Sequence, residues 1–141
     1  MIENGIINAI PADSVDKVEC HDLTFTMSEM LALNSLVKKI HNYNVSVGWW
    51  KNNTDVCRPL ALIHGELSEA LEGFRKKEMD SHLSNRESPE VELTDAIIRL
   101  FDLMGACKYD LGSTMSEKFI YNKHRLDHKP SERIKEGGKQ F

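Results

Sequence analysis

The residues best placed to do chemistry are four acidic side chains in two pairs. Glu66 and Glu69 are three residues apart, and Glu92 and Asp95 have the same spacing. Side chains at this spacing point from one face of a helix, about one turn apart. Two such helices packed together can therefore converge four carboxylates, which would raise one another's pKa values without a counter-charge. Mg²⁺, or Mn²⁺ in its place, relieves that repulsion, since Mg²⁺ prefers carboxylate, water and phosphate oxygens.

Other interpretations of these residues stay open or are disfavoured. Acidic residues at helical spacing also form ordinary solvated surface, but Glu66 borders the apolar stripe of its helix and few basic residues flank the pairs. A di-iron centre would need Glu-x-x-His motifs, and neither helix has an acidic residue followed by histidine three positions on. His124 and His128 have the spacing of a zinc pair, but no third ligand is evident near them.

Four helices are expected to position these side chains, because apolar residues recur at spacings of three and four and helix-start signals recur between them. Capping boxes stand at Thr26–Glu29 and Thr114–Glu117, and Ser88 followed by Pro89 is typical of an N-cap and first turn. The expected helices run from the first capping box to about 44, about 55–77, 88 to about 108, and 114 to about 128.

The chain is expected to be all-α, a four-helix antiparallel bundle over residues 26–130. Residues 1–25 show no helical period and are interpreted as an irregular or short-stranded N-terminal arm. Residues 131–141 carry glycine and basic residues and are interpreted as a flexible basic tail.

Composition limits the partners. The formal net charge of −4 gives no general attraction for nucleic acid, so no nucleic-acid partner is expected. No apolar run reaches the roughly 18 residues of a membrane span, so no membrane partner is expected either. The three cysteines form no disulfide framework, which favours the cytoplasm.

The two acidic motifs also resemble a known family. The segments Ala61–Lys76 and Val91–Leu103, with E-x-x-E followed by E-x-x-D, resemble the MazG-like nucleotide pyrophosphohydrolases, notably small stand-alone and phage-type members. The GWW of Gly48–Trp50, the segment Lys118–Lys129 and the GGK of Gly137–Lys139 extend the similarity over about residues 30–141. If the chain is phage-encoded, the expected compartment is the host cytoplasm.

This resemblance implies an all-α enzyme that cleaves a nucleoside or deoxynucleoside triphosphate to the monophosphate and pyrophosphate. It makes Glu66, Glu69, Glu92 and Asp95 the Mg²⁺ ligands, and Glu69 is our candidate to take the proton of the attacking water. It also implies a homodimer or homotetramer with sites that draw on more than one chain. The wide apolar arc of the third helix agrees, because a monomer would leave part of it exposed.

Further residues are candidates for substrate binding. In a member of this family, Lys118, Asn122 and Arg125 would reach phosphate oxygens from one face of the fourth helix; otherwise they are ordinary surface. The other candidates have both a substrate-binding and a structural interpretation. Trp49 and Trp50 could stack on the base or close the end of the bundle, His64 could touch base or sugar or be a packed histidine, and Asp102 could support the metal ligands or lie on the surface.

Two alternatives to the pyrophosphohydrolase remain. One is a helical module that binds nucleotides without turnover, and the other is a hydrolase of an alarmone-type phosphate substrate. All four carboxylates are present, so the sequence contains no sign of a degenerate site.

Overall fold

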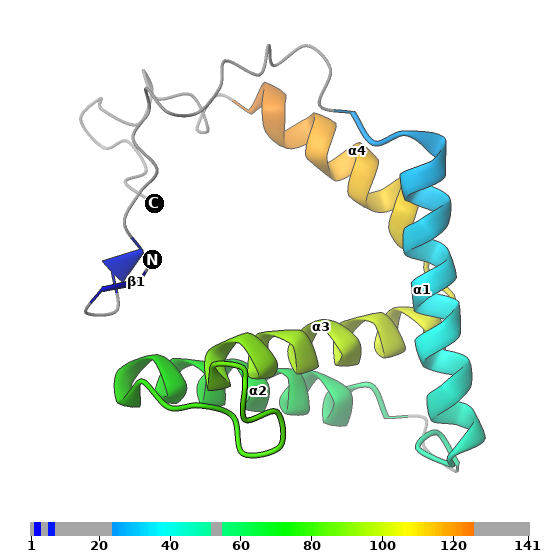
Figure 1. Ribbon diagram of the computed structural model, residues 1–141. Helices are drawn as coiled ribbons and strands as arrows, with labels where there is room; N and C mark the ends of the chain where they lie inside the picture. The colour runs from blue at the N-terminus through cyan, green and yellow to red at the C-terminus, as the bar shows by residue number, and fades with distance from the viewer. Residues whose placement is uncertain (1, 4–5, 8–23, 52–54, 126–141) are drawn as a thin grey trace.

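The computed structural model describes residues 2–3, 6–7, 24–51 and 55–125. Its helices are α1 (Met27–Ser46), α2 (Cys57–Lys76), α3 (Ser88–Ala106) and α4 (Leu111–His124). As Figure 1 shows, α2 and α3 form an antiparallel pair, α1 crosses the end of that pair, and α4 packs on the other half of α1 and diverges from the pair. The predicted all-α class is confirmed.

The two ends of the chain lie largely outside the described residues. Within the predicted N-terminal arm, two-residue strands β1 (Ile2–Glu3) and β2 (Ile6–Ile7) pair antiparallel. The remainder of the arm before residue 24 and the predicted tail 131–141 lie outside the described residues, as does His128 of the possible zinc pair.

Local sequence signals fix the beginning of α1. Thr26 and Glu29 form the predicted capping box: the Thr26 hydroxyl accepts from the Glu29 backbone N–H at 3.3 Å, and the Glu29 carboxylate accepts from the Thr26 backbone N–H at 2.7 Å. At α3 the prediction is off by one residue. Glu87, without a side-chain cap, precedes the helix, and Ser88 is its first residue.

The predicted start of α4 at the Thr114–Glu117 box is wrong. The helix begins at Leu111, because Asp110 caps it by accepting from the Ser113 backbone N–H at 3.0 Å. Asn34 of α1 completes this junction by donating to Asp110 and accepting from the backbone N–H of Gly112 at 2.9 Å. A local cap and a contact with another helix therefore act together at the first turn of α4.

Two glycines allow α1 to approach its neighbours closely. A Cβ at Gly105 of α3 would meet Cβ of His41, and a Cβ at Gly112 of α4 would meet the backbone carbonyl of Met30. Neither obstacle is the mobile end of a side chain. Both crossings of α1 therefore depend on the absence of a side chain.

Replacing Gly105 with alanine is expected to destabilise the fold by about 1–3 kcal/mol, because the added methyl overpacks the α1–α3 crossing. The measurement is urea unfolding followed by circular dichroism. Gly65→Ala is the control, because a Cβ there meets no heavy atom within 4 Å. Alanine at that helical position should be neutral or stabilising by up to about 1 kcal/mol. Equal stabilities for the two variants would contradict the prediction.

The hydrophobic core of the described residues is small. The buried hydrophobic side chains are those of Val37, Ile63, Ala70 and Ala96. Large apolar side chains are exposed on every helix. They include Leu31 of α1, Leu71 of α2, Ile97 of α3 and Tyr121 of α4. The described part of the chain thus has extended apolar surface exposed, part of the α3 arc included.

Candidate functional site

The α2–α3 pair brings three of the predicted carboxylates together. Oxygen atoms of Glu66, Glu69 and Glu92 all lie within 4.8 Å of one another. Glu66 is 8% exposed, Glu69 is exposed and Glu92 is intermediate. Gly73 allows α2 to approach the start of α3 closely, since a Cβ there would lie 2.9 Å from Cδ of Pro89.

Asp95 lies one helical turn beyond Glu92 and is not one of the three converging carboxylates. It remains part of the same electrostatic site, because its charge contributes to the raised pKa of Glu92. Asp95 also lines a pocket that reaches α1 and the turn after it, together with Asn44, Trp49, Ile98, Arg99 and Asp102. The fourth predicted ligand therefore stands between the cluster and this pocket.

The pKa of Glu92 is raised, first by burial and then by the charge of Glu69. A hydrogen bond to Glu66 and the charges of Glu66 and Asp95 act in the same direction. Ionising Glu92 therefore costs more in the folded chain than in the unfolded one. A cation bound among these carboxylates would remove that cost.

Without divalent cations, Glu92→Gln is expected to raise the Tm at neutral pH. Because the folded pKa is raised, ionisation of Glu92 destabilises the fold as pH rises, and glutamine removes this penalty. At pH 4, just below the ordinary glutamate pKa of about 4.3, the carboxyl is mostly protonated in both states, so the difference should become small. The measurement is thermal unfolding in EDTA at pH 4 and pH 7. Glu90→Gln is the control, because its one ion pair among the described residues is an exposed pair with Arg86. A Glu92→Gln variant no more stable than wild type at pH 7 would contradict the prediction.

An arginine on α3 pairs with the most buried of the three carboxylates. Nε of Arg99 donates to Oε1 of Glu66 at 2.6 Å, and the side chains are 34% and 10% exposed, respectively. The guanidinium supplies the counter-charge that the sequence around Glu66 lacks, and it comes from the neighbouring helix. In the sequence, Arg99 stands seven residues after Glu92 and so on the same face of this helix, but no motif there indicates this role.

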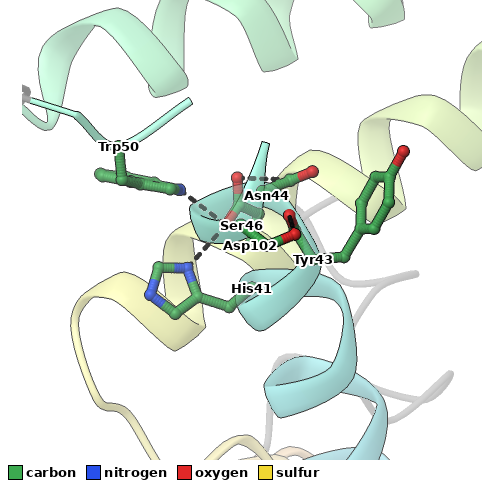
Figure 2. Close-up of polar contacts among 6 residues, drawn as sticks. All are labelled: His41, Tyr43, Asn44, Ser46, Trp50 and Asp102. Atoms are coloured by element: carbon green, nitrogen blue, oxygen red, sulfur yellow. Dashed lines mark hydrogen bonds and ion pairs between the residues drawn. The ribbon is translucent and has the colours of Figure 1, made fainter. Parts of the chain in front are cut away.

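Asp102 is a hydrogen-bonding centre between α3, the end of α1 and the turn that follows. Figure 2 shows that three donors converge on its carboxylate. His41 Nδ1 and Trp50 Nε1 donate to Oδ1 at 2.7 and 2.8 Å, and Asn44 Nδ2 donates to Oδ2 at 2.7 Å. The side chain is only 14% exposed. Asp102 thus anchors neighbouring segments rather than forming free surface.

The two adjacent tryptophans are held differently. Trp50 is fixed by its bond to Asp102 and by an edge-on contact with the ring of His41, at 5.5 Å between centroids. Trp49 is 60% exposed. Both line a pocket together with Arg58, Pro59, Leu62, Arg99 and Asp102. Trp50 therefore forms a fixed wall, whereas Trp49 presents accessible aromatic surface.

The remaining substrate-binding candidates do not lie beside the three carboxylates in the single chain. On α4, Lys118 Nζ lies 4.5 Å and Arg125 Cζ lies 5.9 Å from the centroid of the Tyr121 ring. Oδ1 of Asn122 is buried and has no hydrogen-bond partner among the described residues. This helix diverges from the α2–α3 pair (Figure 1). His64 is exposed and lines none of the pockets described above.

Comparison of the chain with protein-family models, with curated proteins and with solved structures finds no match. Among the described residues, no helix has the length and apolar character needed to cross a bilayer.

Proposed function

We propose that the chain is a Mg²⁺-dependent pyrophosphohydrolase that converts nucleoside or deoxynucleoside triphosphates to monophosphate and pyrophosphate. The observation that carries the proposal is the convergence of Glu66, Glu69 and Glu92, with Asp95 one turn away. Carboxylate oxygens are the donors that Mg²⁺ prefers, so the residues fit the ion. Their E-x-x-E and E-x-x-D pattern is the one that resembles MazG-like enzymes.

The surroundings of each carboxylate indicate whether it would hold the cation or accept a proton. When bound, the cation would neutralise phosphate oxygens and lower the pKa of water. Glu69 is exposed and pairs with no basic group among the described residues, so it is the carboxylate best placed to accept the proton of the attacking water. The water oxygen forms a bond to the α-phosphorus, the bond from that phosphorus to the bridging oxygen breaks, and pyrophosphate leaves.

The pocket beside the cluster supplies a place for the nucleoside. The exposed ring of Trp49 is suited to stack on a base, and the fixed ring of Trp50 limits the depth of the pocket. Arg58 also lines this pocket and forms no ion pair with another described residue, so its guanidinium is available to an anionic ligand.

A second copy of the chain would complete the site in this proposal. Lys118, Asn122 and Arg125 lie on a helix that diverges from the carboxylates, so their predicted contact with phosphate requires α4 of another protomer. Exposed apolar side chains on α1, α3 and α4 support a homodimer or homotetramer. Light scattering coupled to gel filtration gives the oligomeric state. The free thiols of Cys57 and Cys107 fit a reducing, cytoplasmic setting.

The test is pyrophosphate release from the common NTPs and dNTPs, with and without Mg²⁺, with an alarmone added to the panel. Mg²⁺-dependent release from a triphosphate is the expected result, and the order of rates gives the base and sugar preference. Release of pyrophosphate from none of the triphosphates would contradict the proposal.

One observation favours nucleotide binding without turnover as the second candidate. The guanidinium of Arg99 already occupies an oxygen of Glu66, which lowers the charge available to a cation. Calorimetry that shows Mg²⁺-dependent nucleotide binding, together with no turnover, would select this alternative.

A further inference from the structure

Arg99 lies between two features that the proposed function uses separately. Its Nε is bound to Oε1 of Glu66 at 2.6 Å, inside the carboxylate cluster. Its side chain also lines the pocket that contains Trp49 and Trp50. Since the guanidinium carries further N–H groups and is one-third exposed, it can move on its stem without disrupting the helix.

A divalent cation and Arg99 compete for the same carboxylate. Mg²⁺ bound directly to Glu66 would place two positive charges next to the guanidinium, at a ligand distance of about 2.0–2.1 Å from the carboxylate oxygen. The two cations repel one another, and the lone pairs of Oε1 that the cation takes are no longer available to Arg99. Binding of the ion therefore weakens the Arg99–Glu66 pair.

The surroundings indicate where a released guanidinium goes. Asp102 lines the same pocket, but its two oxygens already accept three hydrogen bonds. Asp95 lines the neighbouring pocket, but it is a proposed ligand of the cation. No other carboxylate lines these two pockets among the described residues, so the partner we expect for the guanidinium is an anionic group of a ligand.

We propose that Arg99 is a displaceable counter-ion, which neutralises Glu66 until a divalent cation releases it and then faces the tryptophan pocket to receive an anionic ligand. This inference rests on the proposed function because it takes Glu66 as a cation ligand. It makes cation and anion binding mutually favourable, since each draws the same side chain away from Glu66. Arg99 is thus a positioning residue that couples the two halves of the site.

The first test measures Mn²⁺ alone, without nucleotide, by the electron paramagnetic resonance signal of the free ion. Arg99→Leu is expected to bind Mn²⁺ about threefold to tenfold more tightly than wild type, because the competing cation is gone. Arg99→Lys keeps the positive charge and should stay near the wild-type affinity. If circular dichroism shows that the leucine variant does not fold, Arg99→Gln takes its place in the comparison with wild type, because glutamine is uncharged but polar.

The second test uses tryptophan emission, which reports on this pocket because Trp49 and Trp50 are the two tryptophans of the chain. Mg²⁺ should change the emission of wild type, and the change should be lost in Arg99→Leu. A purely structural role for Arg99 would not produce this difference.

The outcomes separate this inference from the proposed function. Two results would overturn the counter-ion role and leave the pyrophosphohydrolase proposal standing. One is Mn²⁺ binding by Arg99→Leu that is no tighter than that of wild type. The other is wild-type tryptophan emission that does not change at saturating Mg²⁺. Absence of Mn²⁺ binding in both proteins would overturn both. Tighter binding by the variant, with no wild-type turnover of any triphosphate, would support Arg99 as the counter-ion and overturn the enzyme.

Discussion

Replacing Glu69 with glutamine, or Asp95 with asparagine, is expected to abolish pyrophosphate release and leave the helical circular dichroism close to that of wild type. Each change keeps the size of the side chain and removes one negative charge from the cluster. Glu69 additionally loses its ability to accept a proton, and loss of a general base alone lowers rates by about 100-fold or more. Both residues lie on well-formed helices and Glu69 is exposed, so folding should not depend on either charge.

The assay is Mg²⁺-dependent pyrophosphate release from the best substrate of the panel. Glu72→Gln is the matched control, because Glu72 lies on the same helix as Glu69 and, within the described part of the chain, pairs only with the exposed Arg75 and Lys76. It should retain nearly full activity. Activity retained by Glu69→Gln or by Asp95→Asn would refute the assignment of that residue.

The sequence predicted those parts of the fold that depend on local signals. The capping box at Thr26 and the apolar periodicity of the helices are properties of neighbouring residues, so α1, α2 and α3 begin and end close to their expected positions. The convergence of Glu66, Glu69 and Glu92 followed from helical spacing on two paired helices.

The remaining features depend on contacts between helices, which periodicity does not specify. The start of α4 depends on such a contact only in part: Asp110 is a local N-cap signal that the Thr114–Glu117 prediction passed over, whereas its hydrogen bond from Asn34 of α1 is not visible in the sequence. The pairing of Arg99 with Glu66 also requires the packed geometry of two helices. The spacing of Arg99, seven residues after Glu92 and so on the same face of the helix, was the one available signal, and it could not distinguish a counter-ion from a surface cation.

Removing the Asp102 carboxylate is expected to produce the largest loss of stability at a polar position. Asp102→Ala leaves three donors without their acceptor, namely those of His41, Asn44 and Trp50. Unsatisfied donors in partly buried sites are costly, and we expect a loss of about 2–4 kcal/mol in the free energy of unfolding. Asp102→Asn keeps one carbonyl acceptor and should lose less. Urea unfolding measures both, with the exposed Glu117→Ala of α4 as a control expected to change stability by less than about 0.5 kcal/mol.

The same substitution also tests whether Asp102 holds Trp50 in place without holding the three converging carboxylates. Trp50 loses its Nε1 bond in Asp102→Ala, so the tryptophan emission should shift to longer wavelength as the ring becomes more exposed. The three converging carboxylates lie on α2 and α3 and do not include Asp102, so Mn²⁺ affinity should stay close to the wild-type value in the folded variant. A variant as stable as wild type, with unchanged emission, would contradict the anchoring role. A folded variant with lost Mn²⁺ binding would instead show that Asp102 holds the cluster itself, because the α1 contacts would then be fixing the spacing between α2 and α3.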